Sequence, residues 1–187
     1  MEIKDVLNEC SIIGIVGNYE SNLKLSGKVK ELNINNMDNA LKMVGLEIDL
    51  LEQNINSLTI DELWKLELAT KLENEIILIG NLSNSLNNKD IEYMKKLFIK
   101  LACNYNKKIV IVEKNVRIFF GLVKKVFIIE NNKVIYQTSD FYDDKLYEYC
   151  KMPNIVEFIK FVNKDNDRLD ETTDIYELIK DIYRRLS

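Results

Sequence analysis

A chain of 187 residues, 47% apolar and 30% charged, is long enough for one soluble domain with a substantial core. Its net charge of −4 argues against nucleic acid as a partner, and the absence of histidine excludes Ser-His-Asp, Cys-His and His-ligated metal chemistry. No apolar stretch approaches the about 20 residues of a membrane-spanning helix. Cys10, Cys103 and Cys150 lie far apart, which predicts free thiols, and we expect a cytoplasmic protein without a metal site.

Short apolar runs alternate with amphipathic stretches along the first 150 residues, a pattern typical of βαβ units around a largely parallel sheet flanked by helices. The elements expected in chain order are a buried strand at 11–16, a strand at 28–34, a helix at 37–44, a helix at 58–72, a strand at 76–79, a helix at 88–104, a strand at 109–112 and a hairpin of 126–129 with 134–136. The apolar tetrad at 76–79 is expected at the centre of the sheet, buried on both faces.

Beyond residue 150 the pattern is helical only. Pro153 is placed to open one helix, and Asp174 with Glu177 predicts a capping box for the last. We therefore expect an α/β core over 1–150 and a small helical appendage over 151–187. Two apolar stripes are interface candidates, and their alternative role is to pack on each other and on the core: Ile155, Phe158, Ile159 and Val162, and Ile175, Leu178, Ile179 and Ile182.

The order of these segments resembles the ATP-binding cassette (ABC) ATPase family. In the signature position, which opens a helix in that family, stand Leu58, Thr59, Ile60, Asp61 and Glu62. Gly80 and Asn81 follow a strand at the Walker B position, Lys114 follows the strand that carries the switch histidine, and 126–134 resembles the closing hairpin. The resemblance implies a P-loop-NTPase-like fold.

The last helices narrow the resemblance. Met152-Pro153-Asn154, a helix, Thr172-Thr173-Asp174 and a final helix are similar to the C-terminal domain of energy-coupling factor (ECF) transporter ATPases. Those subunits pair and drive vitamin or metal-ion uptake. The resemblance implies a homodimer, an active ABC ATPase subunit or a transporter membrane component as the partner, and a peripheral position at the inner face of the membrane.

The Walker A segment departs from the family pattern. A phosphate loop needs glycines, a lysine on the phosphates and a helix N-terminus behind them. Here Gly17 keeps the leading glycine, Glu20 adds negative charge before Ser21, Leu23 stands at the lysine position and Lys24 comes one residue late. The segment from Ser26 on is similar to the strand that follows the Walker A helix, so this helix is expected to be missing.

The other motifs lack hydrolytic groups as well. Gly80 replaces the aspartate that helps to hold Mg²⁺, the amide of Asn81 replaces the glutamate that acts on water, and Lys114 replaces the switch histidine. Ile60 and Asp61 replace signature glycines, so the chain is not expected to complete a partner's ATP site. We therefore expect a pseudo-ATPase with no catalytic residues and no ATP or Mg²⁺ cofactor, which acts through protein–protein contact.

Two other interpretations remain open from the residues. A vestigial nucleotide sensor would bind adenine nucleotide without hydrolysis, with Tyr19 or Tyr136 stacking on the base, although Glu20 argues against it. An unrelated α/β enzyme would need a convergent acid, base and nucleophile, and the sequence offers no such constellation.

Overall fold

Five strands form one sheet in the order β2-β3-β1-β4-β5. The computed structural model describes residues 6, 10–20, 26–166 and 169–186. The strands are β1 (Ile12–Val16), β2 (Ile76–Gly80), β3 (Lys108–Glu113), β4 (Val126–Glu130) and β5 (Lys133–Thr138). The first four run parallel and β5 runs antiparallel to β4, so the predicted largely parallel sheet is confirmed. The predicted hairpin is also confirmed, with Asn131 and Asn132 in the left-handed conformation that its tight turn requires.

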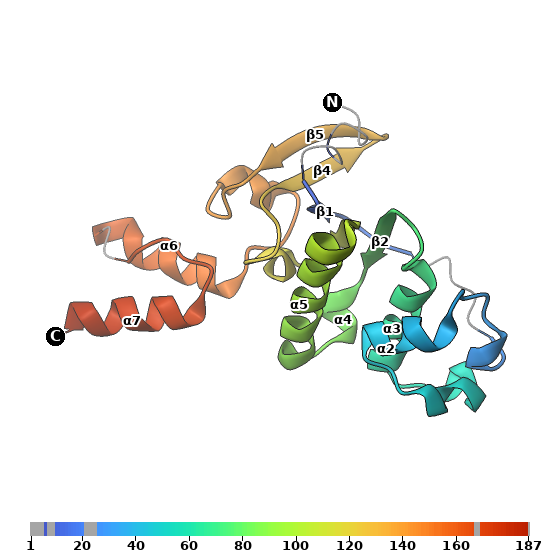
Figure 1. Cartoon of the computed structure of the whole chain (residues 1–187). Helices are drawn as coiled ribbons and strands as arrows, with labels where there is room; N and C mark the ends of the chain where they lie inside the picture. The colour runs from blue at the N-terminus through green and yellow to red at the C-terminus, as the bar shows by residue number, and fades with distance from the viewer. Residues whose placement is uncertain (1–5, 7–9, 21–25, 167–168, 187) are drawn as a thin grey trace.

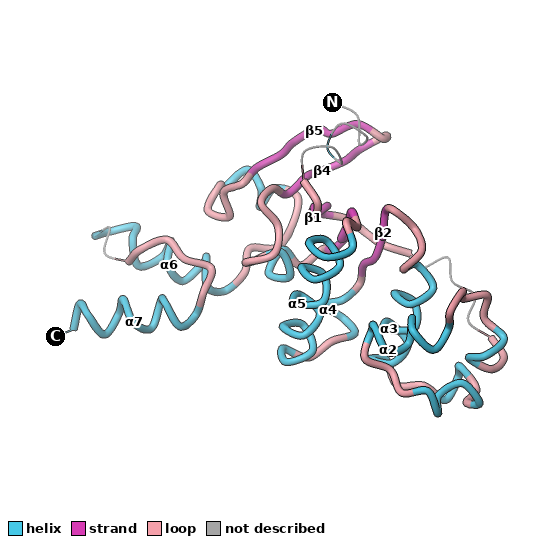
Figure 2. Tube along the Cα trace, viewed as in Figure 1, coloured by secondary structure: helices cyan, strands magenta, loops and turns pink. Residues whose placement is uncertain are grey.

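Helices surround the sheet unevenly (Figure 1). They are α2 (Met37–Val44), α3 (Ile60–Lys71), α4 (Leu82–Ser85), α5 (Asn88–Tyr105), α6 (Asn154–Asn166) and α7 (Ile175–Leu186). Short 3₁₀ turns join them: η1 (Val29–Glu31), η2 (Ile48–Glu52), η3 (Ile55–Ser57), η4 (Val116–Phe119) and η5 (Asp144–Glu148). In Figure 2, α4 and α5 lie beside the sheet, α2 and α3 extend to one end of the molecule, and α6 and α7 extend to the opposite end.

The main core lies between one face of the sheet and the helices. Helix α5 turns Met94, Phe98 and Leu101 inward, and all three are fully buried. They meet strand residues of alternate positions, such as Ile77 and Ile109. Each such side chain stabilises the fold by about 1.5–3 kcal/mol relative to an exposed one. This core fixes the sheet and therefore the ends of its strands.

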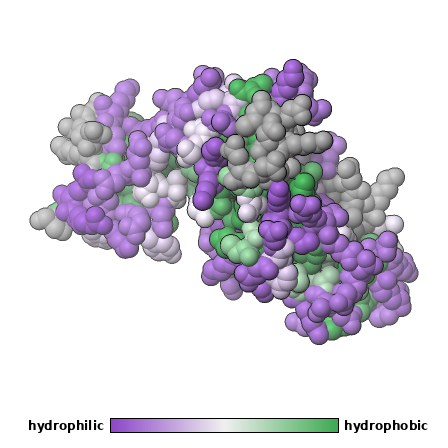
Figure 3. Space-filling model, turned by 45° about the horizontal axis from the view of Figure 1, so that its top comes forward, coloured by the Kyte–Doolittle hydropathy of each residue, from purple (hydrophilic) through white to green (hydrophobic). Residues whose placement is uncertain are grey.

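The position of β2 differs from the prediction for residues 76–79. It lies at the edge of the sheet, and only Ile77 and Ile79 are buried, while Ile76 and Leu78 are 41% and 45% exposed. The expectation of a central strand buried on both faces is therefore wrong. An apolar tetrad shows that a strand has a buried face, but it does not show how many neighbours the strand has. Figure 3 shows hydrophobic residues near the centre of a mostly hydrophilic view.

The expected strand at 28–34 is also wrong. Lys28 makes a single antiparallel bridge to Asn54, closed by the bonds from Val29 N–H to Gln53 O and from Ile55 N–H to Gly27 O. The chain then turns into η1, where Lys30 pairs with Glu52. Alternation alone does not make a strand where no neighbouring strand continues the ladder.

The segment in which the family has its Walker A helix is only partly described in this chain. The described residues 17–20 and 26–28 contain no helix, and residues 21–25 lie outside the described residues. The predicted loss of the Walker A helix therefore stays a prediction.

The appendage consists of α6 and α7 and is joined to the core by polar contacts. The Tyr142 hydroxyl donates to Thr172 O (2.7 Å) and accepts from Thr172 N–H (3.0 Å), while Lys160 pairs with Asp144 at 2.5 Å. Pro153 lies directly before α6, and its carbonyl accepts a hydrogen bond from Glu157 N–H, four residues further along the chain. No helix in the described ranges is long and apolar enough to cross a membrane.

The cap of α7 differs in part from the predicted capping box. The Asp174 carboxylate accepts from Tyr176 N–H (2.8 Å), as a cap should. The Asp174 N–H, however, donates to Thr172 Oγ1 (3.1 Å), and Glu177 pairs with Lys180 instead of reaching back. The Thr172 hydroxyl therefore accepts the bond from Asp174 N–H that the capping box assigns to Glu177.

Candidate functional site

The carboxyl ends of the parallel strands β1, β2 and β3 lie together along one edge of the sheet, where α/β folds commonly bind ligands. This edge holds Gly17 after β1, Gly80 at the end of β2 and Glu113 at the end of β3. The Gly17 N–H donates to Glu113 O at 3.1 Å and extends the pairing of β1 with β3. The described residues that the resemblance assigns to Walker motifs are therefore brought together, while Ser21, Leu23 and Lys24 lie outside the described residues.

The side chain of Tyr19 occupies the space beside Gly80. Tyr19 is only 8% exposed. A Cβ atom placed on Gly80 would lie 2.5 Å from Tyr19 Cβ and would also overlap Val112 O. Real Cβ atoms do not approach other atoms so closely, so residue 80 must be glycine in this arrangement. Position 80, which the resemblance assigns to the Mg²⁺-binding aspartate, therefore has no room for a side chain.

Asn81, the residue after Gly80, holds the backbone of Tyr19. Asn81 has a left-handed backbone, with φ of 57°, and its Nδ2 donates to Tyr19 O at 2.6 Å. The Asn81 amide therefore binds the segment that follows β1. Asparagine tolerates this backbone conformation better than most residues, which gives it a structural reason to stand here.

The Tyr19 hydroxyl lies in a charged cluster with helix α3. Tyr19 Oη donates to Glu67 Oε1 (2.5 Å) and accepts from Lys71 Nζ (2.6 Å). Lys71 Nζ also contacts Glu67 Oε1 (2.5 Å) and Leu78 O (2.8 Å). These contacts connect the segment after β1 to α3 and to β2. Because the lysine is already bonded to protein oxygens, its charge is balanced within the cluster.

Glu113 lies in the candidate site, and the sequence reasoning did not single it out. It is 2% exposed, and Asp181 is the other charged side chain among the described residues that is buried. Its carboxylate accepts from Leu82 N–H, from Ser83 N–H (3.2 Å) and from Ser83 Oγ (2.8 Å). Burial raises the pKa of Glu113, and the bonds from Ser83 partly oppose this shift. The only signal in the sequence is an acidic residue that ends an apolar strand.

The electrostatics at this edge do not favour a triphosphate. Glu113 places a carboxyl at the start of α4, where backbone N–H groups would otherwise attract an anion. Two exposed charged residues flank this edge in the sequence. Glu20 directly follows Tyr19, and Lys114 directly follows Glu113. Tyr136, the other candidate for stacking on a base, bonds to Asp143 and stacks on Tyr149.

The segment at the signature position forms a helix start. Thr59 Oγ1 accepts from Glu62 N–H (3.2 Å) and the Glu62 carboxylate accepts from Thr59 N–H (2.8 Å), which is a complete capping box for α3. Leu58 is buried before the cap, Ile60 is 60% exposed, and Asp61 accepts from Trp64 Nε1 at 3.0 Å. The segment thus opens a helix, as the resemblance implies.

A hollow of about 290 Å³ lies beside this helix start, between the end of α2, η2 and α3. Its charged lining residues are Glu47, Asp49, Asp61, Glu62 and Lys65. Four carboxylates against one ammonium make the hollow negative, so it does not suit phosphate.

The interface candidates of the appendage divide into two groups. Ile159 and Leu178 are buried with Leu169, and three further candidates pack against them: Ile155, Val162 and Ile182. Phe158, Ile175 and Ile179 are exposed. The first group supports the packing alternative, and the second leaves a surface. The sequence analysis missed other exposed residues of this surface: Phe161, Tyr176, Tyr183 and Leu186.

Comparisons with known proteins support the fold. No protein-family model matches the sequence, and a search of curated proteins finds no match. Solved structures of ABC transporter cassettes, however, are similar in fold. The structure of cbiO1 from Clostridium perfringens, part of the ABC transporter complex cbiONQ, has a TM-score of 0.53 at 19% identity and covers 89% of this chain and 68% of its own.

Two further structures agree. An inward-facing putative metal-chelate type ABC transporter has a TM-score of 0.54 at 16% identity, over 73% of this chain and 63% of its own. The dimeric bacterial ABC transporter cassette MJ0796 has a TM-score of 0.51 at 19% identity, over 63% of this chain and 58% of its own. The chain therefore spans about three fifths to two thirds of the length of these structures. It has the α/β fold of an ABC cassette, and identity this low shows the fold alone.

Proposed function

We propose that this chain is a non-hydrolysing, cassette-like domain that acts through protein–protein contact, as a structural or regulatory partner of an ECF-type transporter. The observation that carries the proposal is the closure of the strand ends by Tyr19, which packs on Gly80 while Asn81 binds its carbonyl. A nucleotide site needs this space for Mg²⁺ and for phosphate.

The chemistry of the closed edge supports the absence of hydrolysis. A general base must reach the attacking water and accept its proton. Asn81 is an amide, and Gly80 carries no side chain. Glu113 is the carboxyl at this edge, and its oxygens accept bonds from Leu82 and Ser83. It supports the fold and is not placed to act on a water molecule in a nucleotide site.

The helix start of α3 supports the same proposal for a partner's ATP site. A signature segment must bring its backbone close to phosphate, which glycine permits and a β-branched residue hinders. Ile60 projects into solvent, and Asp61 adds a carboxylate bonded to Trp64 and Lys65. We therefore propose that this chain does not complete the ATP site of a partner subunit. Substituting glycine at 60 and 61 should not create such a site.

The solved structures of similar fold support the proposed class of partner. The cbiO1 structure is described as part of the transporter complex cbiONQ, and the MJ0796 cassette as dimeric. By analogy, the proposed partners are a second copy of this chain, an active ABC ATPase subunit or a transporter membrane component. Such contacts would place the chain at the inner face of the membrane without inserting it.

Phosphate release tests the proposal. The purified chain and its Glu113→Gln variant are incubated in parallel with MgATP at about 1 mM, the upper end of the usual range of KM values. We expect no release above the rate without protein in either sample. Equal release that does not co-elute with the chain in gel filtration would come from a contaminating ATPase, whereas equal release that co-elutes with the chain would refute the proposal. Release by the wild type that Glu113→Gln abolishes would refute the proposal.

A further inference from the structure

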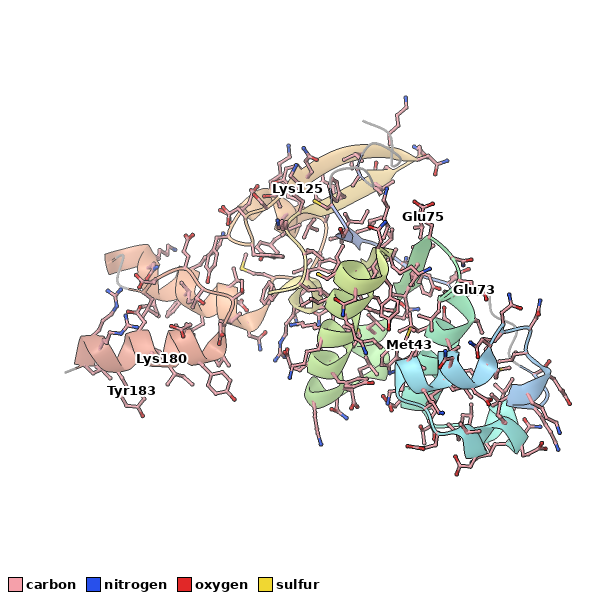
Figure 4. The ribbon with its side chains drawn as sticks, viewed as in Figure 1. Met43, Glu73, Glu75, Lys125, Lys180 and Tyr183 are labelled. Carbon is pink, nitrogen blue, oxygen red and sulfur yellow. The ribbon has the colours of Figure 1, made fainter. Side chains whose placement is uncertain are left out.

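We draw no further inference here: the strongest candidate, the row of exposed apolar side chains on α7 formed by Tyr176, Ile179, Tyr183 (Figure 4) and Leu186, carries nothing because a second copy bound there would only repeat the pairing that the ECF resemblance already implies, and nothing in the described part of the structure shows what else covers it.

Discussion

Gly80 offers the sharpest perturbation of the closed strand edge. In Gly80→Ala the new methyl group would lie 2.5 Å from Tyr19 Cβ and would overlap the backbone oxygen of Val112, so neither neighbour is a flexible side-chain end. Overpacking of this kind costs about 1–3 kcal/mol. The smaller entropy of the unfolded alanine chain returns about 0.4–1 kcal/mol. Because neither contact can yield easily, the cost should lie at the upper end of its range, and we expect a net loss of about 2 kcal/mol in the free energy of unfolding.

Gly17→Ala is the matched control, because Gly17 follows the neighbouring strand end. Its new methyl group would meet only Val112 Cγ1, at an ordinary 3.7 Å. We expect its free energy of unfolding to stay within about 0.5 kcal/mol of the wild type. For a chain of this size, the difference between the two variants corresponds to a melting temperature lower by about 4–8 °C for Gly80→Ala. Urea and thermal denaturation measure both.

The same comparison can refute the structural reasoning. If Gly80→Ala were as stable as Gly17→Ala, Tyr19 would not be packed on β2 as described, and the strand edge would have room for a side chain. The Walker B position would then be free to hold a carboxylate. The proposal of a closed site would lose the observation that carries it.

Other residues give further predictions. Tyr19→Phe removes the hydroxyl between Glu67 and Lys71, and we expect a loss of about 1 kcal/mol in urea denaturation; no loss would contradict the cluster. Because burial raises the pKa of Glu113, the folded state holds its proton to higher pH than the unfolded state. The stability advantage over Glu113→Gln should therefore be greatest near pH 4 and fall as the pH rises, and a rising advantage would contradict this. Burial raises the pKa of Cys150 to about 11, so iodoacetamide at about pH 8 should modify exposed Cys103 first, as peptide mapping would show; equal rates would contradict this order.

The sequence predicts elements well where local signals agree with the fold. The α5 helix has an apolar stripe and an asparagine that caps it, with Asn87 Oδ1 accepting from Lys89 and Asp90 N–H. The hairpin of β4 and β5 has two asparagines that accept left-handed backbone. Both were predicted because the determining residues lie within a few positions of one another.

The arrangement at the site could not be predicted in this way. The bond from Asn81 to Tyr19 joins residues 62 positions apart, and the packing of Tyr19 on Gly80 depends on the order of the strands. The edge position of β2 has the same origin, since the neighbours of a strand are not written in its own residues. Glu113 was missed because nothing local distinguishes a buried acid at a strand end from an exposed one.

The central claim is that the strand ends do not bind nucleotide, and calorimetric titration of the purified chain with ATP tests it most directly. The titration is run with and without Mg²⁺ and extended to about 1 mM ATP, where even a dissociation constant near 1 mM, or about −4 kcal/mol, becomes visible. We predict no saturable heat under either condition. Saturable binding at micromolar concentration would contradict the account, because Tyr19 and Glu113 would then have to leave the positions that close the site.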